Sequence, residues 1–495
     1  MKRKTPRRSI NCVWHLIHFH RISFCVRVFI CFTIVQELSQ LLNRLKNFPH
    51  YKEVFIGAGS GLLILTLMIG GLAFSTPAPE PSASESASPS PSASDAPLRT
   101  CSVTEEATNP SLGTLQAVVL NSETGEVLFD RGSDVPAATA SVMKALTAAA
   151  VLESLGPNHQ VSTKVLADPT NTSKISLVGG GDITLSKTAT GAQSVYKDAP
   201  KLSALVAQVR AWATSNNVTQ ITEINLDSTL FVGSGWESSW PRKLQVEGWI
   251  SEITALQIDG DRTIPEASTS PKTGRPIISA GEQFKLELGD LAANASLAQG
   301  ATPAGFVEIA SVQSQPMSQW LGNILLTSDN GQSEALGQLA AVSAGLPGTF
   351  DSLDAAYKEI LASTELDFSG VTVRDASGLS YLNMVTPRFM AELMRLVDSG
   401  YGDFEVIKSG LPTAGKTGTL SGRFRGDISD AAGKIVAKTG YLVGVHTLSG
   451  IISAEDGTSL TFTIFALDDV GSDVRVAIDT LATAFYRCGN SLSNE

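Results

Sequence analysis

Two pairs of segments with β-type patterns lie near opposite ends of the chain after residue 100 and predict two β-hairpins. Residues 114–120 and 126–130 alternate apolar and polar side chains around a Ser-Glu-Thr-Gly turn. Residues 442–452 and 459–467 are rich in apolar and β-branched residues and flank an Glu-Asp-Gly turn. Because both ends of the chain supply strands, we expect one antiparallel sheet in which the two hairpins meet.

Two helix-forming segments accompany these predicted strands. Ser141–Leu155 is rich in Ala and Leu and ends at a Gly-Pro pair, which is typical of a helix end. Because almost every position in this segment is apolar, we expect a helix that is buried on all sides. Val474–Arg487 has the pattern of a closing helix. The sequence therefore predicts an α+β fold, with an antiparallel sheet flanked by helices.

Residues 160–300 differ in their sequence pattern from the segments on either side. They contain short strand-like runs, many turns and the cluster Gly179–Asp182 (GGGD). We expect this segment to form an inserted, mainly-β accessory domain. Residues 100–159 and 301–490 would then form one domain together, because the chain leaves it and returns to it.

The first hundred residues predict an anchor and a linker. Residues 54–74 carry no charge and are long enough to span a bilayer as a helix. Residues 1–53 are basic, which predicts that they are cytoplasmic and that the chain after residue 74 lies outside. Residues 75–99 are rich in Pro and Ser and predict an extended linker. Residues 54–74 could instead form a core helix, or a signal peptide whose removal leaves a secreted protein.

The distribution of net charge along the chain indicates which kinds of binding partner are disfavoured. Residues 1–53 contain ten Lys/Arg and two acids, a net +8, so the formal −11 of the whole chain leaves −19 on the rest. An acidic body disfavours nucleic acid as a partner. Cys101 and Cys488 flank this body, and in an oxidising compartment they predict a disulfide, with two free thiols as the alternative. The chain has no Cys/His cluster with metal-ligand spacing, so we expect no metal.

The candidate chemistry begins with a serine and a lysine at the start of the buried helix. Ser141 and Lys144 are three residues apart, a spacing that stacks both side chains on one helix face. Burial would favour a neutral Lys144, which could take the proton of Ser141. The pair alone is a weak signal, because a lysine near a helix start can also be a surface residue. Only His159 and His446 follow residue 74, which disfavours a Ser-His-Asp triad.

Two further motifs follow in the order known from penicillin-binding proteins and class A β-lactamases. They are Ser328–Asn330 (SDN) and Lys438–Gly440 (KTG). Ser328 could pass a proton to a leaving amine, and Asn330 could hold the backbone of a peptide substrate. Lys438 and Thr439 offer a cation and a hydroxyl to a terminal carboxylate. These residues, with Ser141 and Lys144, predict a serine acyl-transferase site.

A second K-T-G complicates this assignment. Lys416–Gly418 has the same letters but lies between glycines in a turn-like region. Lys438 instead leads into the predicted strand that a substrate could line, so we assign the motif to Lys438. Tyr441 follows this motif, and its backbone N–H, with that of Ser141, is expected to form an oxyanion hole.

The chain resembles the D-alanyl-D-alanine carboxypeptidase/endopeptidase family of the penicillin-binding protein 4 type, the class C low-molecular-mass penicillin-binding proteins. The resemblance covers most of residues 110–485. Beyond SDN and KTG, it rests on these segments: Pro136–Lys144 (PAATASVMK), Leu177–Leu185 (LVGGGDITL), Asp375–Ser380 (DASGLS), Leu411–Gly415 (LPTAG) and Gly418–Leu420 (GTL). The insert is compact for this family, Tyr441 stands where a small hydroxyl residue is common, and Ala376 replaces a usual glycine.

The resemblance implies a penicillin-binding protein/β-lactamase-like transpeptidase domain and a serine-type D-Ala-D-Ala carboxypeptidase or endopeptidase. Such an enzyme trims peptidoglycan stem peptides or cross-links outside the cell membrane, needs no cofactor, and is inhibited covalently by β-lactam antibiotics. The alternatives are a serine β-lactamase-like hydrolase and a non-catalytic cell-wall or penicillin-binding protein. Covalent labelling by a penicillin separates an active site from a scaffold.

Overall fold

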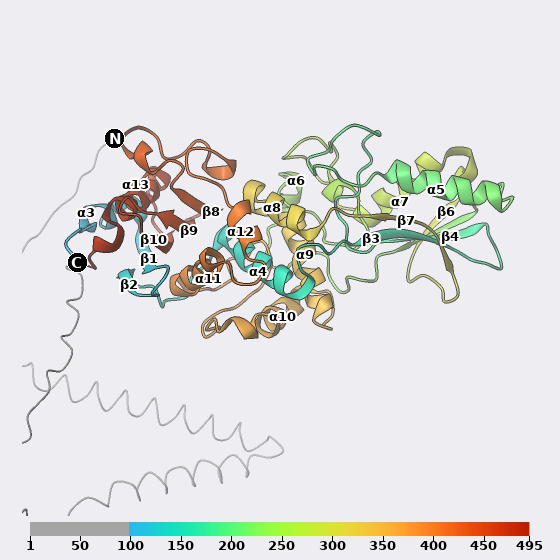
Figure 1. Cartoon of the computed structure of the whole chain (residues 1–495). Coiled ribbons are helices and arrows are strands. Elements are labelled where there is room, and N and C mark those ends of the chain that lie inside the picture. The colour runs from blue at the N-terminus through green and yellow to red at the C-terminus, as the bar shows by residue number, and fades with distance from the viewer. Residues whose placement is uncertain (1–98, 495) are drawn as a thin grey trace, which may run out of the picture. The chain divides into compact units, whose positions relative to one another are not determined.

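The computed structural model describes residues 99–494. The basic segment 1–53, the candidate span 54–74 and all but the last residue of the linker 75–99 lie outside the described residues. Within residues 99–494, no helix is long and apolar enough to cross a membrane. In space, the two β-sheets of this part of the molecule lie toward its opposite ends, with helices between them (Figure 1).

The first sheet has five antiparallel strands in the order β2-β1-β10-β9-β8. The strands are β1 (Thr114–Asn121), β2 (Val127–Arg131), β8 (Ile435–Leu442), β9 (Val445–Ser453) and β10 (Ser459–Leu467). Strand β1 pairs with β10 along its whole length. The prediction that the two terminal hairpins meet in one antiparallel sheet is therefore confirmed.

Helices cover both faces of this sheet because alternate residues of its central strands are apolar on both sides. On β1, Ala117 and Val119 belong to the core shared with α13 (Val474–Cys488). Val118 and Leu120 point the other way and pack with Ala391 of α11 (Pro387–Ser399). A strand buried on both faces reads as a continuous apolar run, as Ala117–Leu120 does.

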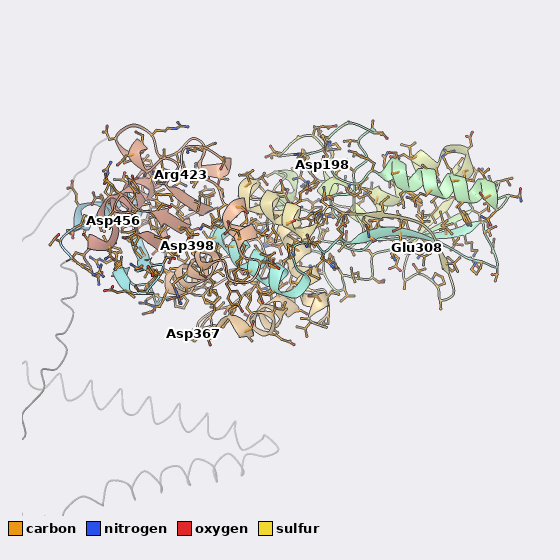
Figure 2. The ribbon with its side chains drawn as sticks, viewed as in Figure 1. Asp198, Glu308, Asp367, Asp398, Arg423 and Asp456 are labelled. Atoms are coloured by element: carbon orange, nitrogen blue, oxygen red, sulfur yellow. A yellow bond between two sulfur atoms is a disulfide. The ribbon has the colours of Figure 1, made fainter. Side chains whose placement is uncertain are left out.

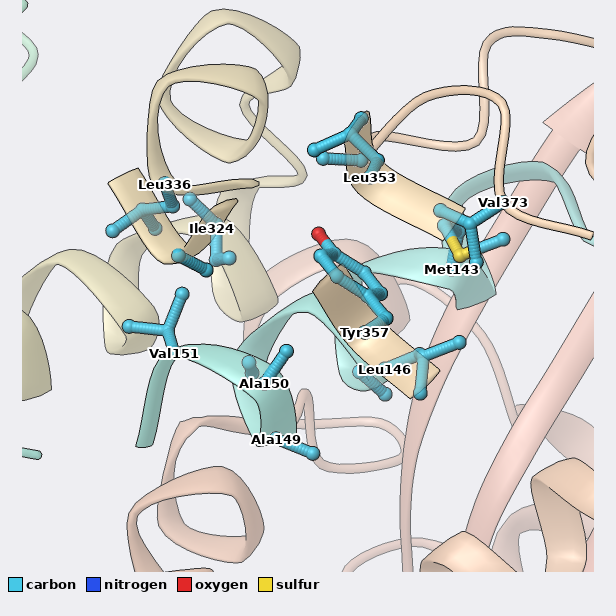
Figure 3. Close-up of a cluster of buried hydrophobic side chains, with 14 of the residues drawn as sticks. Met143, Leu146, Ala149, Ala150, Val151, Ile324, Leu336, Leu353, Tyr357 and Val373 are labelled. Atoms are coloured by element: carbon cyan, nitrogen blue, oxygen red, sulfur yellow. The ribbon is translucent and has the colours of Figure 1, made fainter. Parts of the chain in front are cut away.

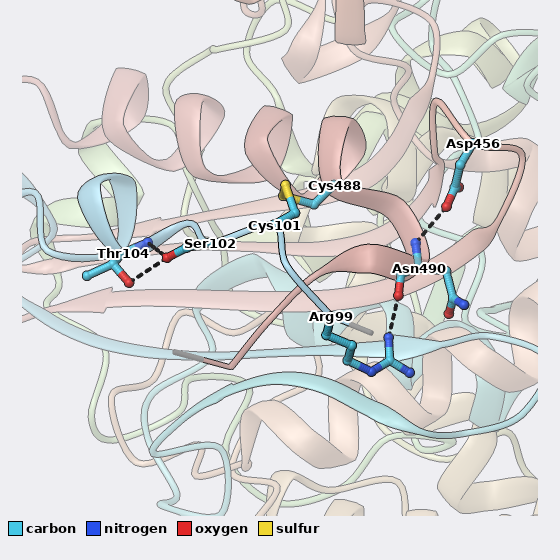
Figure 4. The surroundings of a disulfide bond; sticks show 7 residues. All are labelled: Arg99, Cys101, Ser102, Thr104, Asp456, Cys488 and Asn490. Atoms are coloured by element: carbon cyan, nitrogen blue, oxygen red, sulfur yellow. Dashed lines mark hydrogen bonds between the residues drawn. A yellow bond between two sulfur atoms is a disulfide. The ribbon is translucent and has the colours of Figure 1, made fainter. Parts of the chain in front are cut away.

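A disulfide ties the beginning of the described chain to the end of α13. Cys101 and Cys488 are bonded, with their Cα atoms 5.5 Å apart (Figure 4). Arg99 donates a hydrogen bond to the carbonyl of Asn490, whose N–H donates to Asp456 at 2.8 Å. The short helix α3 (Thr104–Ala107) follows the cysteine. The two ends of the domain are thus joined covalently and by hydrogen bonds.

The helical layer is built around α4 (Met143–Leu155), whose residues from Met143 to Leu152 are all buried. It packs against α8 (Met317–Thr327), α9 (Asn330–Ser343) and α10 (Leu353–Ile360), which surround it in Figure 3. α12 (Glu405–Gly410) packs on α8. The prediction of a buried helix is confirmed from Met143 to Leu152, which explains why this stretch shows no polar face. Ser141 instead lies in the 3₁₀ turn η2 before the helix, and the last turn of α4 is partly exposed.

The second sheet belongs to the insert and has the order β6-β5-β4-β3-β7. Its strands are β3 (Ser162–Ala167), β4 (Lys174–Val178), β5 (Glu223–Asp227), β6 (Ser296–Gln299) and β7 (Val307–Gln313). Strands β4, β5 and β6 are parallel, whereas β3 is antiparallel to both of its neighbours. The sheet therefore needs crossover connections, which its helices supply.

Two helices of the insert, α5 (Leu202–Ser215) and α7 (Pro276–Leu288), share one apolar core with this sheet. The insert is therefore a mixed α/β unit, so the expectation of a mainly-β domain is wrong. It also extends past the predicted end at residue 300, because β7 pairs with β3.

The glycine cluster follows β4, at a point where its backbone closely approaches the backbones of Ala255 and Ser162. A Cβ atom at Gly179 would meet the carbonyl oxygen of Ala255 at 2.2 Å, and one at Gly180 would meet that of Ser162 at 2.3 Å. Only glycine permits this approach of two backbones.

The remaining described elements are short. They are α6 (Lys243–Val246) and the 3₁₀ turns η1 (Pro110–Leu112), η2 (Ala140–Val142), η3 (Asp259–Asp261), η4 (Gly289–Ala292), η5 (Phe350–Ser352), η6 (Ala362–Thr364), η7 (Gly418–Leu420), η8 (Gly426–Ala431) and η9 (Gly489–Ser491).

Candidate active site

Ser141 and Lys144 lie together at the start of the buried helix. Ser141 is in η2 and half-buried, whereas Lys144, in the first turn of α4, is fully buried. The Nζ atom of Lys144 is 3.1 Å from the Oγ atom of Ser141. Ala140, directly before the serine, has a positive φ of 46°, a conformation that non-glycine residues adopt at an energetic cost and that is common at active sites.

Lys144 makes two further hydrogen bonds deep in the site. Its Nζ atom donates to Oδ1 of Asn330 at 2.8 Å and to the carbonyl of Ser377 at 2.7 Å. Burial lowers the pKa of Lys144 to about 8, although the nearby carboxyl groups of Glu334, Asp375 and Asp329 oppose this shift. At neutral and weakly alkaline pH the amine therefore has an appreciable neutral fraction, as a general base requires.

The second serine is paired with the second lysine. Ser328 caps the C-terminus of α8 in the left-handed conformation, with φ 65° and ψ 35°. Lys438, on β8 and fully buried, donates from Nζ to Oγ of Ser328 at 3.0 Å and to the carbonyl of Thr439 at 2.9 Å. Burial lowers the pKa of Lys438 well below its usual value, and the positive charge of Lys144 lowers it further.

Asn330 begins α9, and its amide is oriented from both sides. Its Oδ1 atom accepts from Lys144, and its Nδ2 atom donates to the carbonyl of Trp249, in the insert, at 3.1 Å. Asp329 caps the same helix by accepting from the N–H of Gln332 at 2.8 Å. The SDN motif therefore joins Lys144 to the insert.

An ion pair strengthens this junction. Arg262, in the insert, is 5% exposed and contacts Asp329, 10% exposed, with 2.6 Å between Nη2 and Oδ2. The Tyr196 hydroxyl accepts from the same guanidinium at 2.7 Å. Arg262 and Lys272 hold the pKa of Asp329 below its usual value, against the opposite effect of burial. The charged pair is thus enclosed between two parts of the fold.

The KTG strand forms the other wall of the site. β8 is an edge strand of the first sheet. A Cβ atom on Gly440 would lie 2.9 Å from the backbone nitrogen of Ser141 and 2.1 Å from Oγ1 of Thr447, so no side chain fits there. The hydroxyl of Thr439 is 2.8 Å from that of Thr419, and Tyr441 is exposed at the end of the strand.

The second K-T-G does not form this wall. Lys416 is exposed, and its backbone N–H donates to the carbonyl of Thr413 in a turn. Lys438, in contrast, contacts Ser328 of the second motif.

Arg423, labelled in Figure 2, is bound to Asp479 of α13 at 2.6 Å, so it supports the sheet. His446, on β9, packs its ring against that of Tyr441 in a tilted arrangement, with centroids 4.9 Å apart.

Sequence reasoning missed several residues that surround these motifs. Glu334 and Trp249 were not singled out, and Ser377 and Thr419 entered only as parts of family segments. Glu334 lies four residues after Asn330 on α9, so helical spacing could have placed it on the inner face. The carbonyl of Trp249 carries no signal in the sequence, because any residue type supplies one.

The fold and this arrangement of two serines and two lysines define the class of penicillin-recognising serine enzymes. Residues 100–287 and 275–485 match the D-Ala-D-Ala carboxypeptidase 3 (S13) family. The chain belongs to this family and is a serine-type carboxypeptidase.

Curated relatives support the assignment along most of the chain. A carboxypeptidase of Mycobacterium tuberculosis is 33% identical over 394 residues, which cover 79% of this chain and 84% of that protein. The carboxypeptidase DacB of Mycolicibacterium smegmatis is 32% identical, covering 77% of this chain and 82% of the relative. Among solved structures, penicillin binding protein 4 from Haemophilus influenzae has the same fold, with a TM-score of 0.63, 17% identity, and coverage of 75% of this chain and 95% of that one.

Proposed function

We propose that this enzyme cleaves peptidoglycan stem peptides that end in D-Ala-D-Ala, through an acyl-enzyme on Ser141. The observation that carries this proposal is the contact of Lys144 Nζ with Ser141 Oγ at 3.1 Å, in a buried site where the lysine pKa falls to about 8. A serine hydroxyl is a weak nucleophile until a neighbouring base accepts its proton. Lys144 is the group placed to do so.

In the acylation step, Ser141 Oγ attacks the carbonyl carbon of the penultimate D-Ala and transfers its proton to Lys144. The carbonyl oxygen becomes an oxyanion, which the backbone N–H groups of Ser141 and Tyr441 stabilise. The C–N bond then breaks, and the terminal D-Ala leaves as an amine. Its nitrogen takes a proton from Ser328, and the proton that Lys144 accepted from Ser141 replaces it, so that Lys144 is neutral again before deacylation.

Deacylation restores the serine. A water molecule attacks the acyl carbon, loses its proton to Lys144, and releases the shortened peptide while Ser141 Oγ regains a proton. The contact of Lys438 with Ser328, at 3.0 Å, holds the hydroxyl of the second serine in place for the proton transfer to the leaving amine. These proton transfers between side chains require neither a metal nor an organic cofactor.

Substrate binding is assigned to the walls of the site. Asn330 offers its side-chain amide to the peptide backbone once a substrate displaces the carbonyl of Trp249 as its partner. Thr439 and Thr419, with hydroxyls 2.8 Å apart, suit the terminal carboxylate, as does the amine of Lys438, whose charged form a bound carboxylate would favour. The exposed edge of β8 can pair with an extended peptide, since an edge strand has unpaired backbone groups.

Carboxypeptidase and endopeptidase action share this chemistry. In both, the acyl group is a D-Ala residue, and only the leaving amine differs, being a free D-Ala or the side chain of a second stem peptide. We assign the enzyme to both reactions, with β-lactams as covalent inhibitors because they acylate the same serine.

We place the catalytic domain outside the cytoplasmic membrane, where the cell wall lies, and assign residues 54–74 as its anchor. The bond between Cys101 and Cys488 supports this location, because disulfides persist in oxidising compartments. Residues 1–53 are assigned to the cytoplasm on their positive charge.

The direct test is release of D-Ala from a synthetic stem peptide, measured by chromatography. We expect the wild-type chain to release D-Ala from a peptide ending in D-Ala-D-Ala and not from its D-Ala-L-Ala counterpart. Ser141→Ala should release none. D-Ala release by the Ser141→Ala variant at the wild-type rate would refute the assigned nucleophile.

A further inference from the structure

A short loop forms the wall of the site behind Lys144. It is the segment Asp375–Gly378, far from the three motifs in the sequence. Its Ser377 carbonyl accepts a hydrogen bond from Lys144 at 2.7 Å. Its Gly378 is pressed against the residue before the nucleophile, since a Cβ atom there would meet the carbonyl oxygen of Ala140 at 1.8 Å. The loop therefore contacts Lys144 and the backbone directly before Ser141.

One buried carboxyl group holds this loop in place. Glu334, fully buried on α9, accepts the N–H of Ser377 at 2.8 Å and the N–H of Ala376 at 3.0 Å, one on each oxygen. The carbonyl of Ala376 accepts in turn from the hydroxyls of Thr147 at 2.6 Å and Ser333 at 2.7 Å. Two successive peptide groups are thereby fixed, and the carbonyl of Ser377 is directed at Lys144.

That direction matters for the proton on Ser141. A neutral lysine amine has two N–H donors and one lone pair. The amide oxygen of Asn330 and the carbonyl oxygen of Ser377 can only accept, so they take both donors. The lone pair then remains for the third contact, the hydroxyl of Ser141 at 3.1 Å. Without the Ser377 acceptor, one N–H would be free to point at Ser141 and block proton transfer.

We propose that Glu334 is a positioning residue for acylation: by fixing the Ser377 carbonyl, it directs the lone pair of Lys144 at Ser141. The inference rests on the proposed role of Lys144 as the base. Glu334 itself touches neither the substrate nor the reacting atoms.

The charge of Glu334 adds a second, measurable effect. The charged groups that face Lys144 are Glu334 on α9, Asp329 at the N-cap of that helix, Asp375 in the loop, and Lys438 on β8. Burial and Asp375 raise the pKa of Glu334 to about 8, and Lys144 opposes this shift. The negative form of Glu334 favours the protonated form of Lys144. Replacing the carboxylate by a neutral amide therefore lowers the pH at which Lys144 becomes a base.

The experiment measures the second-order rate constant for acylation by a fluorescent penicillin from pH 5 to 10. The variants are Glu334→Gln and, as a matched control, Ser333→Ala, which loses one hydrogen bond to the same loop but no charge. For Glu334→Gln we expect a plateau rate constant lower by about 10²-fold, the effect of a misplaced reacting group. We also expect its acidic limb to move to lower pH, by less than about one unit because the Glu334 carboxyl group, with a pKa of about 8, is itself protonated over part of that range. Ser333→Ala should keep the wild-type limb.

Two results would overturn the inference while leaving the proposed function intact. One is a Glu334→Gln profile that matches the wild type, and the other is a lower plateau with an unmoved limb, which is the mark of a purely structural role. If Glu334→Gln does not fold, Glu334→Asp keeps the charge: a lowered plateau with an unmoved limb supports the inference, and a wild-type plateau contradicts it. A wild-type protein that penicillin does not acylate would instead refute the proposed function.

Discussion

The ion pair between Arg262 and Asp329 gives the most quantitative prediction about how the insert supports the site. The two side chains are 5% and 10% exposed and 2.6 Å apart. Arg262→Met leaves the carboxylate of Asp329 buried without its partner. Breaking a buried pair in this way costs about 3–5 kcal/mol of folding free energy. We therefore expect the free energy of unfolding to fall by that amount at pH 7.

A surface ion pair of the insert serves as the matched control. Lys164 and Glu308, which lies on β7 and is labelled in Figure 2, are 2.8 Å apart but 44% and 47% exposed. An exposed pair contributes about 0–1 kcal/mol, so Lys164→Met should change the unfolding free energy by no more than that. Both variants are measured by urea denaturation followed by circular dichroism.

The pH dependence supplies the sign of the effect. In the wild-type protein, Arg262 and Lys272 keep the pKa of Asp329 below its usual value, so its stabilising contribution is present at neutral pH and is lost as pH falls through that lowered pKa. In Arg262→Met, burial dominates and the carboxyl group takes up a proton at higher pH. The stability difference between the two proteins should therefore shrink as pH falls. A cost below 1 kcal/mol at pH 7, equal to that of the surface pair, would refute the reasoning.

Three further predictions concern the site and its scaffold. Gly440→Ala adds a methyl carbon that would lie 2.1 Å from Oγ1 of Thr447. The resulting displacement of the strand should slow acylation by penicillin about 10²-fold, as stopped-flow labelling would show. Because the pKa of Lys144 is about 8 and its neutral form is the base, the wild-type acylation rate should fall as pH drops below that value. Replacing Cys101 and Cys488 by serine should lower the unfolding free energy by about 2–5 kcal/mol, and a reductant should lower wild-type stability similarly in urea titrations.

Sequence patterns predicted the parts of the fold that depend on local periodicity. Alternation predicted the strands of the first hairpin, runs rich in apolar and β-branched residues predicted those of the second, and the apolar segment after Ser141 predicted α4. The family resemblance predicted that the three motifs come together in one site. The crossover sheet of the insert was less accessible, because strands β4, β5 and β6 pair across long connections that leave no periodic signal.

The support of the site could not be predicted from local patterns. Glu334 acts through the backbone N–H groups of Ala376 and Ser377, which every non-proline residue possesses. Trp249 contributes a carbonyl, and Gly440 is needed because a different strand passes close to it. Such contacts join segments far apart in the chain, so their geometry depends on the complete tertiary structure.

The central claim is that Ser141 forms the acyl-enzyme, and mass spectrometry after incubation with benzylpenicillin tests it most directly. The account predicts one penicilloyl adduct per wild-type molecule, located by peptide mapping on the fragment that contains Ser141, and no adduct on Ser141→Ala. An adduct on another serine, or none on folded wild-type protein, would contradict the account.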